Sequence, residues 1–162
     1  METRVGIGYD VHVLAPDRAL VLGGVAIPFE RGLLGHSDAD VALHAIMDAL
    51  LGAAALGDIG QHFPPSDPTY RGADSRALLA RVRELLRERG WVPVNVDCTI
   101  VAERPRLAPH TPAMRAVIGA TLGLADDAVS IKATTNERIG FIGREEGIAA
   151  MAVAQIARSA QG

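Results

Sequence analysis

The segment from Gly35 to Pro65 constrains the fold most, because it predicts one helix with polar chemistry at both ends. Ser37 and Asp38 have side-chain oxygens that accept hydrogen bonds from free backbone N–H groups, so we expect the helix to begin there. Gly57 is expected to end it. Apolar residues recur every three or four positions in between, as in a helix that packs on a sheet: Val41, Ala42, Ala45, Ile46, Ala49, Leu50 and Ala53.

The other face of this predicted helix carries polar groups. Asp40, His44 and Asp48 are four residues apart, so they align along one side of an otherwise apolar helix. Two interpretations of His44 stay open on the helix alone: a metal ligand, or a core histidine satisfied by a neighbouring aspartate. If it is a ligand, we expect Asp40 or Asp48 to orient its ring.

Asp10 and His12 favour the metal interpretation. They follow a short strand pattern over residues 4–9, and in extended backbone residues two apart point to the same side. Together with His44 they make a set of two imidazoles and one carboxylate. This set suits a divalent ion such as zinc and leaves a coordination position open, which is typical of catalysis.

The 162 residues predict a single domain over residues 1–162 with its own core. A net charge of −3 with 49% apolar residues disfavours both disorder and a broad nucleic-acid surface. The chain shows neither a signal-like leader nor an apolar run long enough to span a bilayer, so we expect a cytoplasmic protein without a membrane partner. The lone Cys98 lies in an alternating strand pattern and is expected to be a small buried hydrophobe.

The rest of the chain predicts alternating strands and helices, hence a two-layer α/β or α+β domain. Strands are expected at 18–27, with a pivot at Gly23 and Gly24, and at 94–101 and 129–134; helices are expected from 74 or 75 to 90 and at 112–122. Residues 28–34 read as a loop, and residues 140–147 are too glycine-rich for a helix. Residues 148–157 fit either a helix or a strand buried on both faces.

Three loops carry candidate ligand contacts. Residues 58–68 are dense in turn formers whose polar groups can reach a ligand near the end of the central helix. Residues 102–109 form a proline-bounded loop with two arginines, as in a structural turn or a clamp on an anionic ligand. Residues 134–137 follow a strand at its carboxyl end, the usual place for ligand contacts in layered α/β structures.

These motifs, taken together and in order, resemble one enzyme family. They are Asp10-Val11-His12, the run from Gly35 to His44, Gly57-Asp58-Ile59-Gly60 with Phe63-Pro64, the run from Lys132 to Glu137, and the run from Gly143 to Gly147. The set resembles the 2-C-methyl-D-erythritol 2,4-cyclodiphosphate synthases over essentially the whole chain.

The resemblance implies an activity and an architecture. The activity is that of a metal-dependent lyase of non-mevalonate isoprenoid biosynthesis, which cyclises 4-diphosphocytidyl-2-C-methyl-D-erythritol 2-phosphate to the 2,4-cyclodiphosphate and releases CMP. The architecture is an α+β two-layer sandwich, in which helices pack on one face of a mixed β-sheet. It further implies a homotrimer with active sites between neighbouring subunits, and it makes residues 148–157 a strand.

The resemblance also implies roles for individual residues. Asp10, His12 and His44 would bind one zinc ion per subunit, and Glu137 a second divalent ion, Mg²⁺ or Mn²⁺, on the diphosphate. His36 and Thr135 match catalytic positions that stabilise the transition state. Substrate contacts would come from Ser37, Asp58, Ile59, Gly60, Phe63, Pro64, Pro65, Ser66 and Asp67 for the methylerythritol part, and from Ala102, Glu103, Arg104, Pro105, Arg106, Leu107, Ala108, Thr134 and Asn136 for cytidine and phosphates. Phe141 and Arg144 match ligand contacts near the trimer centre. Pro65 and Asn136 differ from the residues that some family members carry at these positions, and these differences affect only the detail of the substrate contacts.

The implied chemistry agrees with the residues present. The 2-phosphate of the substrate attacks its own β-phosphorus, so no protein nucleophile is required, and none stands out in the sequence. Two other functions use the same metal set: a zinc hydrolase that attacks phosphoesters with a bound hydroxide, and an oligomer held together by structural zinc.

Overall fold

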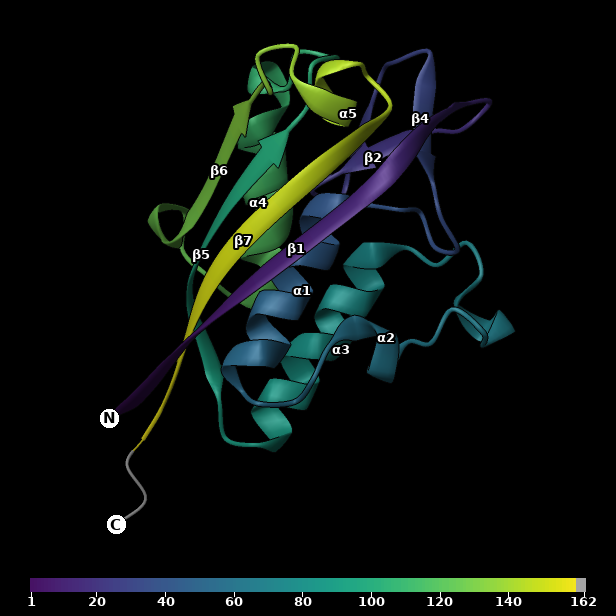
Figure 1. Ribbon diagram of the computed structural model, residues 1–162. Coiled ribbons are helices and arrows are strands. Elements are labelled where there is room, and N and C mark those ends of the chain that lie inside the picture. The colour runs from purple at the N-terminus through teal and green to yellow at the C-terminus, as the bar shows by residue number, and fades with distance from the viewer. Residues whose placement is uncertain (160–162) are drawn as a thin grey trace.

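The computed structural model describes residues 1–159, which are built around a five-stranded mixed sheet in the order β4-β1-β7-β5-β6. β5 and β6 are parallel, and the other neighbours are antiparallel. Figure 1 shows the long strands β1 and β7 crossing the molecule side by side. The strands of this sheet are β1 Glu2–Pro16, β4 Arg31–Leu34, β5 Val92–Val101, β6 Val129–Thr134 and β7 Gly147–Arg158.

Three helices cover one face of the sheet: α1 Val41–Ala53, α3 Ser75–Glu88 and α4 Thr111–Leu122. This is the two-layer α+β arrangement that the resemblance implied, so the predicted fold class is confirmed. Shorter elements complete the chain: α2 Ile59–His62, α5 Gly140–Gly143, and 3₁₀ turns at Pro68–Tyr70, Ala108–His110 and Asp126–Ala128. Among residues 1–159, no helix has the length and apolar character needed to cross a membrane.

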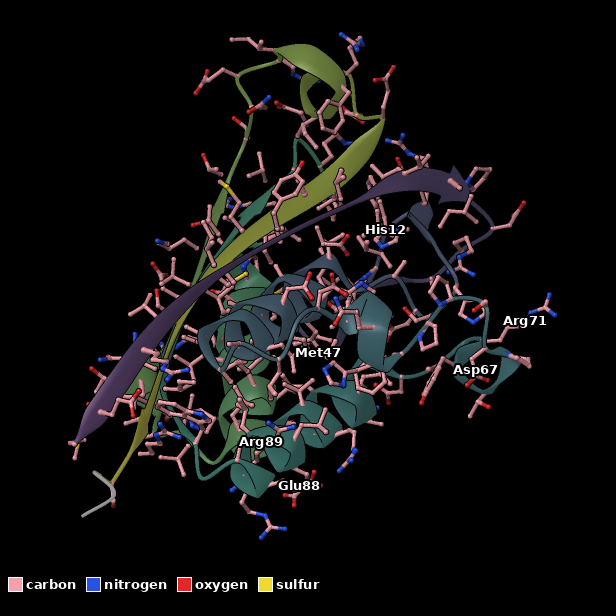
Figure 2. All side chains as sticks on the ribbon, turned by 60° about the horizontal axis from the view of Figure 1, so that its bottom comes forward. His12, Met47, Asp67, Arg71, Glu88 and Arg89 are labelled. Atoms are coloured by element: carbon pink, nitrogen blue, oxygen red, sulfur yellow. The ribbon has the colours of Figure 1, made fainter. Side chains whose placement is uncertain are left out.

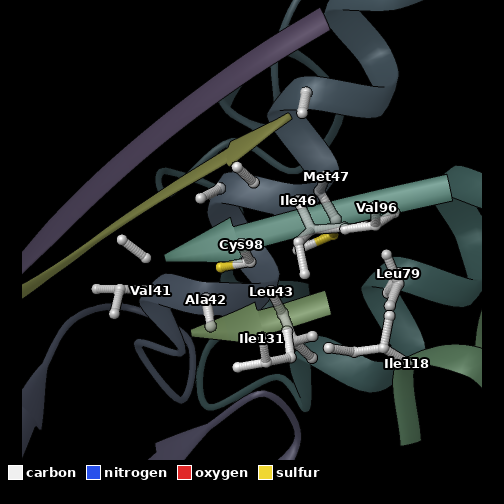
Figure 3. Packing of buried hydrophobic residues seen from close by; sticks show 14 of the residues in the cluster. Val41, Ala42, Leu43, Ile46, Met47, Leu79, Val96, Cys98, Ile118 and Ile131 are labelled. Carbon is white, nitrogen blue, oxygen red and sulfur yellow. The ribbon is translucent and has the colours of Figure 1, made fainter. Parts of the chain in front are cut away.

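The central helix α1 lies unusually close to β1. A Cβ atom on Gly8 would lie 1.9 Å from the carbonyl oxygen of Ala45, and one on Gly6 would lie 2.0 Å from that of Ala49. Glycine on the strand is therefore required for this approach. Larger side chains fill the core between the three helices and the rest of the sheet. Figure 3 shows part of this core, in which Leu43, Ile46 and Met47 of α1 lie with Val96, Cys98, Leu79, Ile118 and Ile131.

The central helix is shorter than predicted at both ends. It begins at Val41 rather than at Ser37 or Asp38, because the carboxylate of Asp40 accepts from Leu43 N–H and takes the N-cap position. It ends at Ala53 rather than at Gly57, and the left-handed backbone of Ala55, with φ +57°, lies before that glycine.

Three further element predictions were wrong. The strand predicted over 18–27 is a hairpin of β2 Leu20–Leu22 and β3 Val25–Ile27, which turns at Gly23 and Gly24 with φ of +59° and +75°. The predicted loop at 28–34 contains β4, which pairs with β1. Within the glycine-rich segment 140–147, residues 140–143 form the single helical turn α5.

The other elements agree with the predictions. The predicted helices at 75–90 and 112–122 match α3 and α4, and the strands at 94–101 and 129–134 match β5 and β6. Residues 148–157, left open by the residues alone, belong to the strand β7.

Candidate metal centre and substrate cavities

The structure brings Asp10, His12 and His44 together. β1 presents Asp10 and His12 to the helix side of the sheet, and α1 presents His44. Asp10 Oδ2 lies 2.8 Å from His44 Nδ1 and 3.1 Å from His12 Nε2. One ligand atom of each residue lies within 4.8 Å of the others, and His12 is labelled beside β1 in Figure 2.

The charges at this cluster favour a cation. Burial alone would raise the pKa of Asp10, but hydrogen bonds with His12 and His44 outweigh it and lower the pKa to about 2. The bond to Asp10 in turn raises the pKa of His12. The distances given above bring a carboxylate oxygen and two imidazole nitrogens to one point. This donor set fits a divalent ion such as zinc and leaves one position of a tetrahedral site for another ligand.

In both histidine rings, the nitrogen that faces away from Asp10 also makes hydrogen bonds. His12 Nδ1 lies 2.9 Å from the carbonyl oxygen of Leu34, which accepts its N–H. His44 Nε2 lies 3.0 Å from Ser75 Oγ and 3.2 Å from Ser37 Oγ.

The expectation that Asp40 or Asp48 orients His44 was wrong. Asp40 is fully buried and accepts backbone N–H groups from Leu43, Gly23 and Gly24, which fixes the helix start and the β2–β3 turn. Asp48 accepts Ile59 N–H at 2.8 Å and so holds the start of α2. Both carboxylates are occupied by backbone donors, because each lies where another segment approaches α1.

A cavity of about 260 Å³ opens beside the three residues. His36 borders it, and its Nε2–H donates to the carbonyl oxygen of Asp67 over 3.1 Å. Sequence reasoning missed two lining residues: Tyr70 belonged to no pattern, and Leu78 lay inside the helix predicted from 74 or 75 to 90. The residues predicted here that line the cavity are Asp10, His12, His36, Ser37, His44, Ile59, Gly60, Phe63 and Pro65.

The remaining residues of that predicted set support the cavity wall. Asp58 caps α2 by accepting Gln61 N–H, and Asp67 caps the turn at Pro68–Tyr70 by accepting Thr69 N–H. Pro64 and Ser66 lie in the same segment without lining the cavity.

A second cavity, of about 320 Å³, lies at the carboxyl ends of β5 and β6. It is lined by the predicted residues Ala102, Glu103, Arg104, Pro105, Arg106, Leu107, Ala108, Thr134 and Thr135, together with Ala133. Glu103 Oε1 accepts the backbone N–H groups of Asn136 and Arg138, at 2.9 and 3.0 Å. Glu137 lies between them, exposed and in a left-handed conformation with φ +52°.

The two cavities have no lining residue in common within residues 1–159. Phe141 lines a third hollow with Val11, Val13 and Gly147, and Arg144 pairs with Glu146 at 3.2 Å. One chain thus presents the predicted metal ligands and the predicted cytidine contacts on different parts of its surface.

Comparisons with known proteins agree with this geometry. The YgbB family profile matches residues 3–157. A curated 2-C-methyl-D-erythritol 2,4-cyclodiphosphate synthase from Symbiobacterium thermophilum is 69% identical over 153 residues, which are 94% of this chain and 98% of the relative. The synthase from Dechloromonas aromatica is 63% identical over 158 residues, 98% of this chain and 99% of the relative.

Solved structures show the same fold. The bifunctional IspDF from Campylobacter jejuni is 40% identical with a TM-score of 0.94; the match covers 98% of this chain and 43% of that longer protein. A 2C-methyl-D-erythritol-2,4-cyclodiphosphate synthase in a CDP-bound form is 36% identical with a TM-score of 0.88, and covers 95% of this chain and 100% of its own. From the profile match and these identities, the chain belongs to the YgbB family, together with the 2-C-methyl-D-erythritol 2,4-cyclodiphosphate synthases.

Proposed function

We propose that this chain cyclises 4-diphosphocytidyl-2-C-methyl-D-erythritol 2-phosphate to 2-C-methyl-D-erythritol 2,4-cyclodiphosphate and releases CMP, within non-mevalonate isoprenoid biosynthesis. The observation that carries the proposal is the convergence of Asp10, His12 and His44 at one end of an open cavity, in a chain 69% identical to a curated synthase. The whole of residues 1–162 would act as one domain, and we place the enzyme in the cytoplasm.

In this proposal Asp10, His12 and His44 hold zinc, and Glu137 contributes to a second site for Mg²⁺ or Mn²⁺. A bound divalent ion supplies Lewis-acid polarisation of phosphate oxygens. The chain's own residues orient the substrate. Holding the attacking 2-phosphate oxygen in line with the β-phosphorus is worth about 7–11 kcal/mol in well-aligned systems. Apolar lining from Ile59 and Phe63 would exclude water, whose attack would compete with ring closure.

The remaining predicted roles follow the cavities. His36, steadied by Asp67, and Thr135 would stabilise charge on the phosphates as they react. Ser37, Gly60 and the 63–67 segment would contact the methylerythritol part. The second cavity would take the cytidine, a proposal supported by the CDP-bound form of a related synthase.

The separation of the two cavities supports a site shared between copies of the chain. The outer face of the sheet carries a contiguous apolar patch, since Tyr9 pairs with Met151 and Ile7 with Val153 across β1 and β7. A patch of this kind marks an interaction surface. We propose that it joins three copies in a homotrimer, in which the metal cavity of one copy meets the second cavity of its neighbour. The exposed apolar residues of the patch are Val5, Ile7, Tyr9, Val11, Val13, Met151 and Val153.

The variant His44→Ala tests the function. It removes one of three ligands, so CMP release from the full substrate is expected to be lost while the assembly seen by light scattering stays unchanged. His110→Ala is the matched control, because this histidine borders neither cavity. Full turnover by His44→Ala would refute the proposal.

A substrate analogue that lacks the 2-phosphate separates the two enzymatic functions. A cyclase should release no CMP from it, whereas a zinc hydrolase should release CMP as before. Phosphorus NMR of the product from the full substrate would show the cyclic diphosphate directly.

A further inference from the structure

Ser75 contacts the candidate metal centre from an element that carries no predicted ligand. It is the first residue of α3, its side chain is fully buried, and its Oγ lies 3.0 Å from His44 Nε2. Sequence reasoning gave it no role beyond the start of a helix.

The hydrogen bonds around Ser75 fix where its proton lies. Its Oγ is 2.5 Å from Asp38 Oδ1, and its backbone N–H donates to Asp38 Oδ2 over 2.9 Å. A carboxylate accepts hydrogen bonds and has none to give. Ser75 therefore donates its hydroxyl proton in a hydrogen bond to Asp38, and the serine oxygen can only accept a hydrogen bond from His44.

The same reasoning fixes the proton on His44. If Ser75 Oγ accepts, then Nε2 must carry hydrogen, and Ser37 Oγ at 3.2 Å accepts from the same N–H. When the site holds a metal, His44 is a neutral imidazole with one N–H, so the lone pair lies on Nδ1. That atom is the one 2.8 Å from Asp10 Oδ2, at the point where the three ligand atoms converge.

The second histidine provides an internal comparison. His12 Nδ1–H donates to the carbonyl oxygen of Leu34, so His12 offers Nε2 to the same point. The two rings thus present opposite nitrogens, and each is held by an acceptor behind it. Such contacts orient a metal-bound histidine and raise its basicity.

We propose that Ser75, held by Asp38, is a positioning residue of the metal centre: it accepts from His44 Nε2–H and so directs His44 Nδ1 toward the metal. The inference rests on the metal site of the proposed function. It adds a carboxylate–hydroxyl–imidazole chain, Asp38–Ser75–His44, that starts in the loop before α1, passes through Ser75 at the start of α3 and ends at the ion.

Zinc affinity of purified variants, measured by competition with a chromophoric chelator, tests the proposal. Ser75→Ala removes the acceptor and is expected to weaken zinc binding about 10- to 100-fold. Ser75→Thr keeps the hydroxyl and should recover most of the affinity.

Asp74→Ala is the matched control. Asp74 is the N-cap of the same helix and accepts Arg76 N–H, but it does not contact His44. It should lower the melting temperature and leave zinc affinity unchanged. Equal losses of affinity in Asp74→Ala and Ser75→Ala would show a merely structural effect and overturn the proposal.

A second measurement needs no variant. In nitrogen-15 NMR of the zinc-loaded wild-type protein, the His44 ring should show a slowly exchanging proton on Nε2. A proton on Nδ1 instead, or none protected on Nε2, overturns the role of Ser75. If the wild-type protein binds no zinc at all, the metal site of the proposed function fails instead, so the two failures are distinguishable.

Discussion

The two cavities differ in how their residues are held. The predicted metal ligands come from the middle of β1 and from α1, two elements in backbone contact, with a hydrogen-bond acceptor behind each ring. The second cavity lies between loops at the ends of β5 and β6, where exposed arginines pair with the largely buried carboxylates of Glu103 and Glu145. The first region is fixed by packing within one chain, whereas the second depends on surface electrostatics and, in our proposal, on a neighbouring copy.

Glu145 shows the character of the second region. Its carboxylate contacts Arg31, Arg104 and Arg138 at 2.8, 3.4 and 3.2 Å. Arg104 also pairs with Glu30 at 3.1 Å. The side chains of Arg104 and Arg138 are 51% and 69% exposed, and ion pairs of such exposed groups contribute little singly and weaken with salt. We therefore expect changes in this region to alter substrate binding more than stability.

The largest expected effect is that of Gly8→Ala in the packed region. The new Cβ would meet the carbonyl oxygen of Ala45, a backbone atom that a rotamer change cannot move away. We expect a loss of about 3 kcal/mol or more in unfolding free energy. Zinc binding should also weaken, because a larger distance between β1 and α1 separates Asp10 and His12 from His44. Urea unfolding and zinc titration measure the two effects.

The control for this prediction is Gly52→Ala on the outer side of α1. Nothing lies within 4 Å of the Cβ it would add, so about 0.5–1 kcal/mol of stabilisation is expected from the helix interior. Wild-type stability of Gly8→Ala would contradict the close packing of α1 on β1.

Asp40→Ala is expected to have the next largest effect. It leaves the N–H groups of Leu43, Gly23 and Gly24 without their acceptor in a fully buried place, at a cost of about 2–4 kcal/mol. Removal of the exposed cap Asp74 should cost about 1 kcal/mol. Thermal unfolding of both variants measures the two losses of stability. Equal losses would contradict the expected difference between a buried and an exposed helix cap.

Glu103→Ala tests the second region. Glu103 Oε1 holds the backbone on both sides of Glu137, so its loss should raise the KM for the substrate about 10-fold, or about 1.4 kcal/mol, with zinc affinity unchanged. Glu103→Gln keeps an oxygen that can accept both N–H groups and should stay close to wild type. Steady-state kinetics separates the two variants. Parallel losses of zinc and substrate binding would mean that the regions are not independent.

The smallest expected effect is the reaction of Cys98 with a thiol reagent in the folded protein. Burial raises the pKa of its thiol to about 12, and its side chain lies in the core shown in Figure 3. We expect iodoacetamide at pH 8 to leave the folded protein unmodified and to label it in denaturant, as read by mass spectrometry. Rapid labelling of the folded protein would show that the interior opens to solvent.

The predictions that succeeded used local periodicity. α3 shows an apolar stripe and the N-cap Asp74, α4 shows an apolar stripe and a proline in its first turn, and β5 shows alternation, so their positions follow from neighbouring residues. β7 was ambiguous because much of it is buried regardless of alternation, and small alanines fit either structure.

The parts of the site that could not be predicted depend on tertiary contacts. The Asp10-x-His12 spacing fixed a shared side, but only the fold shows that His44 reaches it. The roles of Ser75 and Asp40 could not be read from the sequence, since Ser75 meets His44 from 31 positions away and Asp40 serves a turn 16 and 17 positions earlier. Whether the assigned ligand contacts bind substrate stays a prediction.

The strand order has a consequence for the growing polypeptide. β7 lies at the centre of the sheet, between β1 and β5, although it follows both of them along the chain. Until the ribosome has released residues 147–158, β1 and β5 each have one edge without a partner. The sheet that carries Asp10 and His12 therefore cannot close until residues 147–158 have left the ribosome, and until then the two unpaired edges can pair with other strands.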